Sequence, residues 1–198
     1  MAIILHETQI FSPISVFSAY QRIDEIMIEK YENFQKGSFR NRYVIQTANG
    51  IKTMTIPLCK GKNQQMLISD VEISYDEDWV KNHIQTIKSA YGKSPYFEFY
   101  YDDIAKLLNR KHRFLFDLNY ECLAFMISKL KLEKNILFSD SYQRIIDHNM
   151  DKRNHDWMAE KSSKPYIQVW SEKYNFEPNL SILDLLFCTG PEAKTHLN

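Results

Sequence analysis

Glycine and proline are scarce in this chain: only 5 Gly and 6 Pro occur among its 198 residues. Chains rich in these residues form collagen-like repeats, flexible linkers or disordered segments, so these classes are excluded. The chain instead carries 12 Tyr and 12 Phe, and its hydrophobic fraction of 44% is ordinary for a folded protein. No repeat and no linker rich in Gly, Ser or Pro divides it. We therefore expect residues 1–198 to form a single domain.

Cysteine is also scarce, and the three that occur, Cys59, Cys122 and Cys188, form no CxxC pair. Widely spaced thiols in an odd number predict free, mostly buried cysteines in a reducing compartment rather than a disulfide framework. Cys188, which precedes a Gly-Pro turn, is the cysteine that we consider as a nucleophile.

A surplus of one charge is absent, because 25 Lys and Arg balance 25 Asp and Glu. The chain thus lacks the overall positive field that favours nucleic-acid binding, although a local basic patch remains compatible with it. No stretch approaches the roughly 20 apolar residues that a membrane span requires. The apolar run at residues 1–5 is too short for a signal peptide. We expect a cytoplasmic protein that does not enter a membrane.

Several motifs that specify a chemistry are missing. Walker A, GxGxxG, GxSxG and HExxH sequences do not occur, so the corresponding enzyme classes have no support. His148 and His155 lie in a polar segment with Asp nearby, but no Cys/His framework surrounds them. We therefore expect no metal site, and the sequence leaves the cofactor unknown.

The first part of the chain alternates strands with a helix. Residues 2–5 are expected to form a buried strand. Apolar residues then recur at helical spacing, which predicts a helix over residues 13–24 with Ser12 as its N-cap and Pro13 at its first position. Residues 25–31 alternate enough to form a second strand.

A hairpin is expected next. Residues 43–47 and 51–58 are rich in strand-forming side chains, and Asn49-Gly50 between them is a strong signal of a two-residue turn. Pro57 is expected to mark the end of the second strand.

Helices are expected in the middle of the chain. Ser74 and Glu77 form a capping box ahead of a helix over residues 79–91, which ends at Gly92. Further helices are expected from Ser94-Pro95 to residue 108 and over residues 114–130.

The last third is expected to return to the sheet. Strands are predicted over residues 135–138 and 166–170, and residues 146–164 are predicted to form a long surface loop. Strands that alternate with helices indicate an α/β protein: a single domain with a mixed, mostly parallel sheet, a β-hairpin and flanking helices.

Four segments in order carry a resemblance to a known family. They are residues 10–17 (IFSPISVF), residues 35–42 (QKGSFRNR) with their continuation to residue 57, residues 79–97 (ending in YGKSPYF), and residues 180–191 (LSILDLLFCTGP). Along almost its whole length the chain resembles the WbqC-like protein family, in particular its shorter members from Bacteroides and relatives. Longer members often have a Gln-Pro pair where this chain has residues 6–9 (HETQ). The family is associated with O-antigen gene clusters, so the resemblance implies a role in surface polysaccharide biosynthesis without naming a reaction.

The most specific of these segments also holds most of the candidate chemistry. Lys36, Arg40 and Arg42 place three cations within seven residues. Guanidinium groups pair bidentately with phosphate or carboxylate, and Lys adds a point charge. If the segment leads into a strand, alternation puts Arg40 and Arg42 on one face. The alternative is a solvated edge of the sheet. The substrate-binding residues predicted here are Gln35, Lys36, Ser38, Arg40, Asn41 and Arg42.

Three further residues complete the predicted site. His83 is predicted as a catalytic base or anion contact, and a partly buried histidine held by a carbonyl group is the alternative. Ser94 stands at a helix start, where free N–H groups favour anions, although N-capping explains it equally well. Asp184 is a lone carboxylate in an apolar helix, and we predict that it orients Arg40 or Arg42 as an ion-pair partner.

Three functions remain open. The first is a transferase that acts on a phosphorylated or nucleotide-activated precursor of surface polysaccharide, with the basic segment binding the phosphates. The second is a non-catalytic binding or scaffold protein that recognises a phosphorylated ligand or a partner enzyme. The third and least favoured is a nucleic-acid binder that stacks bases on Phe39 and Tyr43. A symmetric homodimer is the default expectation for assembly.

Overall fold

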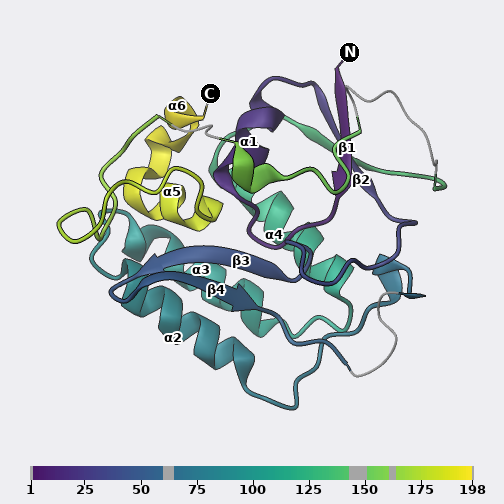
Figure 1. Ribbon diagram of the computed structural model, residues 1–198, viewed down its shortest axis with the longest axis horizontal. Coiled ribbons are helices and arrows are strands. Elements are labelled where there is room, and N and C mark those ends of the chain that lie inside the picture. Colours follow the sequence, from purple (N-terminus) through teal and green to yellow (C-terminus); the bar gives the residue numbers. More distant parts are fainter. Residues whose placement is uncertain (1, 60–64, 143–150, 161–163, 198) are drawn as a thin grey trace.

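The computed structural model describes residues 2–59, 65–142, 151–160 and 164–197. A parallel sheet of three strands stands beside a separate antiparallel hairpin, and helices flank both (Figure 1). This arrangement confirms the predicted α/β class with a mostly parallel sheet and a hairpin.

The parallel sheet has the strand order β1-β2-β5. Its strands are β1 (Ile3–Glu7), β2 (Glu25–Glu29) and β5 (Asn135–Phe138). The helix α1 (Ile14–Gln21) connects β1 to β2, because parallel neighbours require a crossover connection. In this register Glu7 lies beside Glu29 at the carboxyl ends of the first two strands. Two carboxylates therefore meet at one edge of the sheet.

The start of α1 differs from the prediction. The N-cap residue is Pro13 rather than Ser12, and it makes no side-chain capping hydrogen bond. Instead the side chain of Asn179 accepts a hydrogen bond of 2.9 Å from the backbone N–H of Ser15. A distant residue thus satisfies a free N–H of the first turn, which no local pattern could indicate.

The hairpin consists of β3 (Arg42–Thr47) and β4 (Gly50–Thr55). The connecting residues are Ala48 and Asn49, so the predicted turn at Asn49-Gly50 is wrong by one residue. Gly50 is the first residue of β4 and pairs with Thr47. Its positive φ of +97° is a backbone conformation that glycine adopts more readily than other residues. The second strand ends at Thr55, before Pro57.

Three helices form the layer beside the hairpin: α2 (Trp79–Tyr91), α3 (Phe97–Asn109) and α4 (Leu115–Lys129). The predicted capping box is wrong, because Asp78 is the N-cap of α2 and accepts a hydrogen bond from the backbone N–H of Lys81. Gly92 ends α2 as predicted, with a right-handed φ of −58°.

The helix α5 (Ile182–Thr189) lies in the interior, and all of its residues are buried. It contacts α1, α3 and β3, and Figure 1 shows the hairpin running between α5 and α2. The chain closes with the short helix α6 (Ala193–His196) after a 3-10 turn, η4 (Gly190–Glu192). Two further 3-10 turns are η2 (Ile68–Asp70) and η3 (Trp157–Ala159).

Two predictions for the last third fail. Residues 166–170 form no strand, because Tyr166 and Gln168 point their side chains at Asp184 while their backbone pairs with no neighbouring strand. In the predicted surface loop, Trp157 is buried among core residues with an exposed fraction of 1%. Residues 146–150 and 161–163 of that loop lie outside the described residues. Among the helices that are described, none has both the length and the apolar character to cross a membrane.

Candidate functional site at the carboxyl ends of the parallel strands

Charged and amide side chains gather where the parallel strands end. We call this group the carboxyl-end cluster. Its members are Glu7, Gln9, Glu29, Glu32, Arg40, Asp151, Arg153 and Asn154. In α/β proteins, ligands bind in the crevice outside the carboxyl ends of the strands, so this edge is the expected place for a site.

Glu29 connects β2 to two other segments. Its Oε1 accepts hydrogen bonds from Ser139 Oγ at 2.6 Å and from the backbone N–H of Tyr31 at 2.8 Å. Its Oε2 pairs with Arg153 Nη1 at 3.0 Å, and Nη2 of the same guanidinium pairs with Asp151 at 2.5 Å. Arg153 thereby fastens its own loop to the carboxyl end of β2.

A second arginine, Arg40, forms a bidentate pair with Glu32. The Nε–Oε1 distance is 2.8 Å and the Nη2–Oε2 distance is 2.5 Å. Arg40 is fully buried, and Glu32 is 5% exposed. Burial raises the pKa of Glu32 above its usual value, while the hydrogen bond and charge of Arg40 oppose that rise. Asn154 Oδ1 accepts a further bond of 3.1 Å from Arg40 Nη2.

Glu7 has a different environment. Its Oε1 accepts a hydrogen bond of 2.8 Å from Gln9 Nε2, and its Oε2 accepts one of 3.0 Å from the backbone N–H of Asn154. Glu29 and Glu32 each pair with an arginine, whereas Glu7 forms no ion pair within the part of the chain that the structure describes. Asn154 therefore bridges Arg40 and Glu7, with a left-handed φ of +59° that Asn tolerates better than most residues.

Two buried atoms of the cluster have no hydrogen-bond partner, namely Arg40 Nη1 and Gln9 Oε1. One is a donor and the other an acceptor, and both side chains are more than nine-tenths buried. Buried polar groups are rarely left unpaired, and each such group costs roughly 1–3 kcal/mol. The cluster can thus still bind one acceptor and one donor.

The loop between β1 and α1 is strained at this edge. Phe11 is 1% exposed and has a φ of +40°, which is uncommon for a residue with a large side chain. Backbone strain of this kind concentrates at functional sites, because packing must enforce it.

His6 is a buried residue of β1, close in sequence to the same loop. Its Nε2 hydrogen-bonds to the hydroxyl of Tyr20, and its ring meets the edge of Trp157. Burial lowers the pKa of His6 to about 4, so the imidazole is neutral at physiological pH.

A small cavity of about 150 Å³ opens at the strand ends. Its lining comes from Leu5, Met27, Glu29, Phe138 and residues 139–141. The lining includes two carboxylates, Glu29 and Asp140, and the hydroxyls of Ser139 and Ser141. Glu29 is therefore the member of the cluster that lines this polar cavity.

The predicted basic segment does not act as one surface. Gln35 and Lys36 are exposed, and Ser38 Oγ donates to the Gln35 carbonyl at 2.6 Å, which closes a turn. Asn41 is buried and its Nδ2 donates to the Ile56 carbonyl at 2.9 Å. Of the six predicted residues, these four therefore hold the segment in place or face solvent.

Arg40 and Arg42 do not share a strand face. The strand β3 begins at Arg42, so Arg40 precedes it and turns into the cluster. Arg42 is half-buried, and its Nε has no hydrogen-bond partner. The alternation argument required a strand from residue 38, which the structure does not have.

His83 belongs to a separate buried group under the hairpin. Its Nδ1 lies 3.0 Å from the hydroxyl of Tyr43, and its ring packs edge-on against Trp79 at 5.1 Å. Burial lowers its pKa to about 4, against a hydrogen bond to the backbone of Thr55 that raises it. The buried ring is thus held by Tyr43 at Nδ1 and by the backbone of Thr55, which corresponds to the alternative of a partly buried histidine held by a carbonyl group. Tyr43 is fully buried and cannot stack on a base.

The predicted pairing of Asp184 with Arg40 or Arg42 is wrong. Asp184 Oδ2 accepts hydrogen bonds from the Tyr166 hydroxyl at 2.6 Å and from Gln168 Nε2 at 2.9 Å. Burial raises the pKa of Asp184 to about 6, because neutral donors offset its desolvation only in part. The interior position of α5 brings these neutral side chains to the carboxylate instead of an arginine.

Ser94 lies close to that group and apart from the cluster. Its Oγ donates to the Tyr91 carbonyl at 2.7 Å, and it lines a pocket of about 650 Å³ together with Tyr166, Gln168 and Cys188. Burial raises the pKa of the Cys188 thiol, which argues against it as a nucleophile. The structure therefore brings Ser94 near the partners of Asp184 but not near the arginines or His83.

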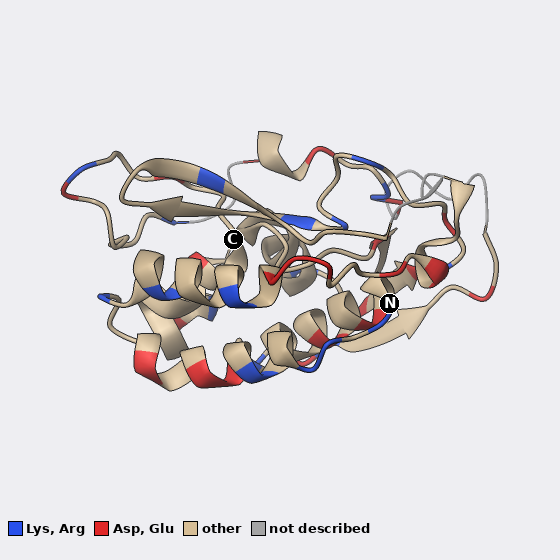
Figure 2. Ribbon diagram, turned by 90° about the horizontal axis from the view of Figure 1, so that it is seen from below, with Lys and Arg blue, Asp and Glu red and all other residues tan. Residues whose placement is uncertain are grey.

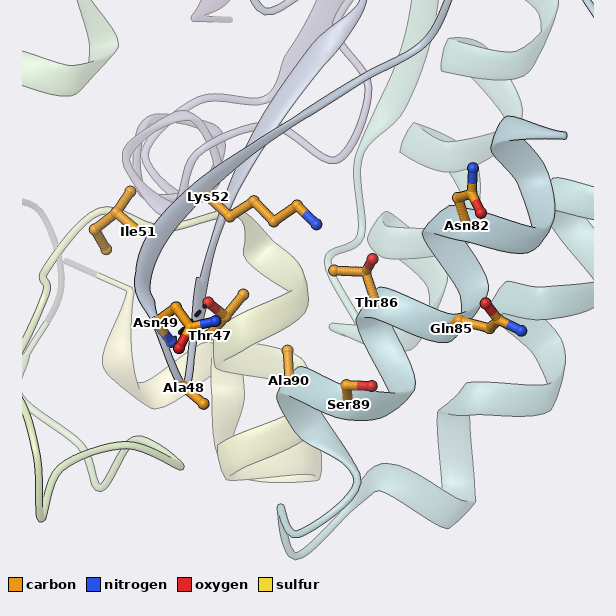
Figure 3. Close-up of a pocket in the computed structure, with 10 residues that line it drawn as sticks. All are labelled: Thr47, Ala48, Asn49, Ile51, Lys52, Asn82, Gln85, Thr86, Ser89 and Ala90. Carbon is orange, nitrogen blue, oxygen red and sulfur yellow. Dashed lines mark hydrogen bonds between the residues drawn. The ribbon is translucent and has the colours of Figure 1, made fainter. Parts of the chain in front are cut away.

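A third concavity of about 680 Å³ lies between the hairpin and α2 (Figure 3). Figure 3 shows Thr86 of α2 directed toward the hairpin and Lys52 extending from β4 toward α2. Asn82, Gln85 and Ser89 of α2 also line this concavity. Charges elsewhere are mixed, since Figure 2 shows Lys and Arg interspersed with Asp and Glu along the helices. In the described ranges no three His, Cys, Asp or Glu side chains come together as a metal site, and His148 lies outside those ranges.

Sequence reasoning missed most of the cluster. It singled out Arg40 but not Glu7, Glu29, Glu32 or Arg153. The available signal was that two apolar strands each end in a glutamate, at Glu7 and Glu29. A charged residue at the carboxyl end of a parallel strand is a stronger indication of a site than a run of surface cations.

The fold and the cluster define an α/β protein with buried ion pairs at the carboxyl edge of a short parallel sheet. The chain matches the WbqC-like protein family over residues 10–168 and 149–196, and it belongs to that family. This confirms the resemblance carried by the four segments. The uncharacterised protein Rv1507c of Mycobacterium tuberculosis (strain ATCC 25618 / H37Rv) is 27% identical over 208 aligned residues, which cover 88% of each chain. No solved structure gives a significant match.

Proposed function

We propose that this protein is a cytoplasmic transferase that binds a phosphorylated or nucleotide-activated precursor at the carboxyl-end cluster. The observation that supports this most directly is Arg40. Its guanidinium is fully buried and oriented by Glu32 and Asn154, while Nη1 has no partner. An anionic oxygen placed at Nη1 would satisfy that donor.

The position of the cluster supports the same proposal. It lies at the edge of the sheet where α/β proteins bind ligands, and a cavity opens there beside Glu29. A guanidinium held by two other residues binds an anion without losing further side-chain freedom, and such preorganisation favours catalysis as well as binding. Surface polysaccharide precursors are the class to test first, because the family is associated with O-antigen gene clusters.

Chemical roles for His83 and Asp184 receive less support. Each is engaged by other side chains in its own buried group, apart from the arginines. We therefore place the proposed chemistry on the carboxyl-end cluster.

A thermal-shift panel tests the binding part of the proposal. The ligands are sugar nucleotides, free nucleotides, acyl-CoA and short oligonucleotides. A ligand at 100 times its dissociation constant should stabilise the native state by about 2.7 kcal/mol, which is a shift of several degrees. We expect that shift from a phosphorylated small molecule.

The decisive variant replaces the buried pair as a whole, Glu32→Leu with Arg40→Met. Removing both partners avoids an unpaired buried charge, so this variant should fold. The matched control is Arg113→Ala, which removes an exposed arginine paired with Glu72. The shift should vanish in the double variant and persist in the control. A shift that survives the double variant, or that only oligonucleotides produce, contradicts the proposal.

A non-catalytic binding protein is the second candidate. The burial of His83 and the contact of its Nδ1 with Tyr43 favour it, because they remove the predicted acid–base group from the carboxyl-end cluster. Incubating the wild type with the stabilising ligand and candidate acceptors distinguishes the two. Consumption of the ligand supports the transferase, and tight binding without turnover supports the binding protein.

A further inference from the structure

Glu7 stands apart among the buried glutamates. It is 3% exposed, and in the described part of the chain its hydrogen-bond donors are neutral: the amide of Gln9 and the backbone N–H of Asn154. Glu29 and Glu32, which are buried to a similar degree, each have an arginine. A buried carboxylate without a cation is unfavourable, since neutral hydrogen bonds replace only part of its hydration. Glu7 is therefore the carboxylate of this cluster that lacks a counterion.

Gln9 adds a second and independent indication. Its Nε2 must face Glu7, because an amide oxygen in that place would oppose a carboxylate oxygen. The amide oxygen Oε1 is thereby directed away from that bond. It has no hydrogen-bond donor, although Gln9 is only 4% exposed. An acceptor without a donor thus lies next to a carboxylate without a cation.

Within the described residues, neither His6 nor Arg40 supplies the missing cation. The neighbouring His6 is neutral at physiological pH, because burial lowers its pKa to about 4. Arg40 is committed to Glu32 and Asn154 through Nε and Nη2. A buried water molecule would satisfy Gln9 Oε1 but would leave the charge of Glu7 uncompensated.

We infer that the ligand of the carboxyl-end cluster carries a protonated amine, which Glu7 and Gln9 Oε1 bind beside the anionic group taken by Arg40. This inference rests on the proposed function and narrows it to amino-bearing phosphorylated substrates. A primary ammonium has three donors, no acceptor and a positive charge, which matches an acceptor without a donor, Gln9 Oε1, beside a carboxylate without a cation, Glu7.

Asn154 sets the relation between the two halves of the site. Its Oδ1 accepts from Arg40 and its backbone N–H donates to Glu7, so one residue separates the anion-binding donor from the ammonium-binding acceptors. The ammonium and the anion must consequently be close together in one ligand. An amino sugar phosphate satisfies this requirement, and a neutral sugar phosphate satisfies only the half at Arg40.

The test compares D-glucosamine 1-phosphate with D-glucose 1-phosphate by calorimetry on the full chain. In the first compound an amine next to the phosphate-bearing carbon replaces the hydroxyl of the second. N-acetyl-D-glucosamine 1-phosphate, in which the amine is blocked, and inorganic phosphate complete the set. We expect the amine to tighten binding by roughly tenfold or more, since hydrogen bonds between charged groups are the strong ones. The advantage should disappear when the pH is raised above the pKa of the amine.

Two variants locate the effect. Glu7→Gln keeps the shape of the side chain and should abolish the preference for the amine, so that the amino and hydroxyl compounds bind this variant equally. Gln9→Met is the second variant, to be used if Glu7→Gln fails to fold. It removes only the amide and should reduce the preference for the amine. Equal affinity of wild type for the amino and hydroxyl compounds overturns this inference and leaves the proposed function intact. Binding of neither compound, nor of inorganic phosphate, counts against both.

Discussion

The protein holds buried carboxylates in two different ways. In the carboxyl-end cluster, Glu29 and Glu32 pair with arginines that come from loops. In the interior helix α5, Asp184 accepts hydrogen bonds from the neutral side chains of Tyr166 and Gln168. The first arrangement keeps full charges and leaves donor and acceptor atoms unpaired, as a binding site requires. The second fastens a loop to a helix and explains why the pKa of Asp184 is raised to about 6.

Arg40→Ala should have the largest effect on stability. It leaves the carboxylate of Glu32 buried without its cation, and breaking a buried pair in this way costs about 3–5 kcal/mol. The double change Glu32→Leu with Arg40→Met should recover most of that loss. Urea unfolding of the wild type, Arg40→Ala and the double variant measures the loss of stability and its recovery. Equal losses in the single and double variants would mean that the pair contributes by packing rather than by charge.

Acidification from pH 6.5 to 4 should destabilise the wild type. Burial lowers the pKa of His6 and His83 to about 4, so between these pH values the unfolded chain binds protons that the folded chain does not. Each histidine then accounts for roughly 3 kcal/mol of stability that is present above pH 6.5 and lost as the pH falls toward 4.

Protonation of Asp184 should offset part of the stability that is lost on acidification. In Asp184→Asn the free energy of unfolding should therefore fall more steeply as the pH is lowered. The folded-state pKa of Asp184 is about 6, above the usual value of 3.8, so the folded chain binds this proton first and gains stability as the pH falls between these values. Free energies of unfolding at pH 7, 5.5 and 4.5 test the difference. If the free energy of unfolding changes equally with pH in wild type and in Asp184→Asn, Asp184 has an ordinary pKa.

Asp184→Leu should destabilise the protein at neutral pH by roughly 1–3 kcal/mol, because it leaves the Tyr166 hydroxyl without its acceptor. The amide of Gln168 loses one acceptor but keeps the carbonyl of Glu177. Asp184→Asn retains an acceptor and should cost about 1 kcal/mol or less. Thermal and urea unfolding at pH 7.5 provide the comparison. If Leu is tolerated as well as Asn, the neutral donors do not depend on the carboxylate.

Arg113→Ala should have the smallest effect, within about 0.5 kcal/mol. Arg113 pairs with Glu72 at 2.8 Å, but its side chain is 72% exposed, and water already solvates both charges. This exposed pair is the reference for the buried pair of Arg40, and the same unfolding experiment measures it. A loss as large as that of Arg40→Ala would mean that burial is not the source of the difference.

Local patterns predicted much of the fold. The strand β5 has the predicted bounds, and α2 begins and ends at the predicted residues. Boundaries failed where distant residues intervene, as Asn179 does at the start of α1. The strand predicted over residues 166–170 failed because alternation there reflects contacts with Asp184, which resemble the pattern of a strand without its backbone pairing.

The candidate site was less predictable than the fold. Arg40 was identified from its charge and its place in a family-specific segment, but its partner was not. Glu32 precedes Arg40 by only eight residues, yet a bidentate contact depends on how the intervening loop folds back. Asp184 was recognised as unusual because a carboxylate in an apolar helix must find partners, although its partners were neutral.

The sequence by itself determined the elements, the α/β class and the family, because hydrophobic periodicity, turn residues and ordered motifs are local properties. Only the tertiary structure decided which charges meet. Hydrophobic burial sets the paths of β1, β2 and the loops, and those paths bring Glu7, Arg40 and Asn154 together from widely separated positions. Whether a charged residue faces water, a counterion or a ligand depends on that convergence, which no local pattern encodes.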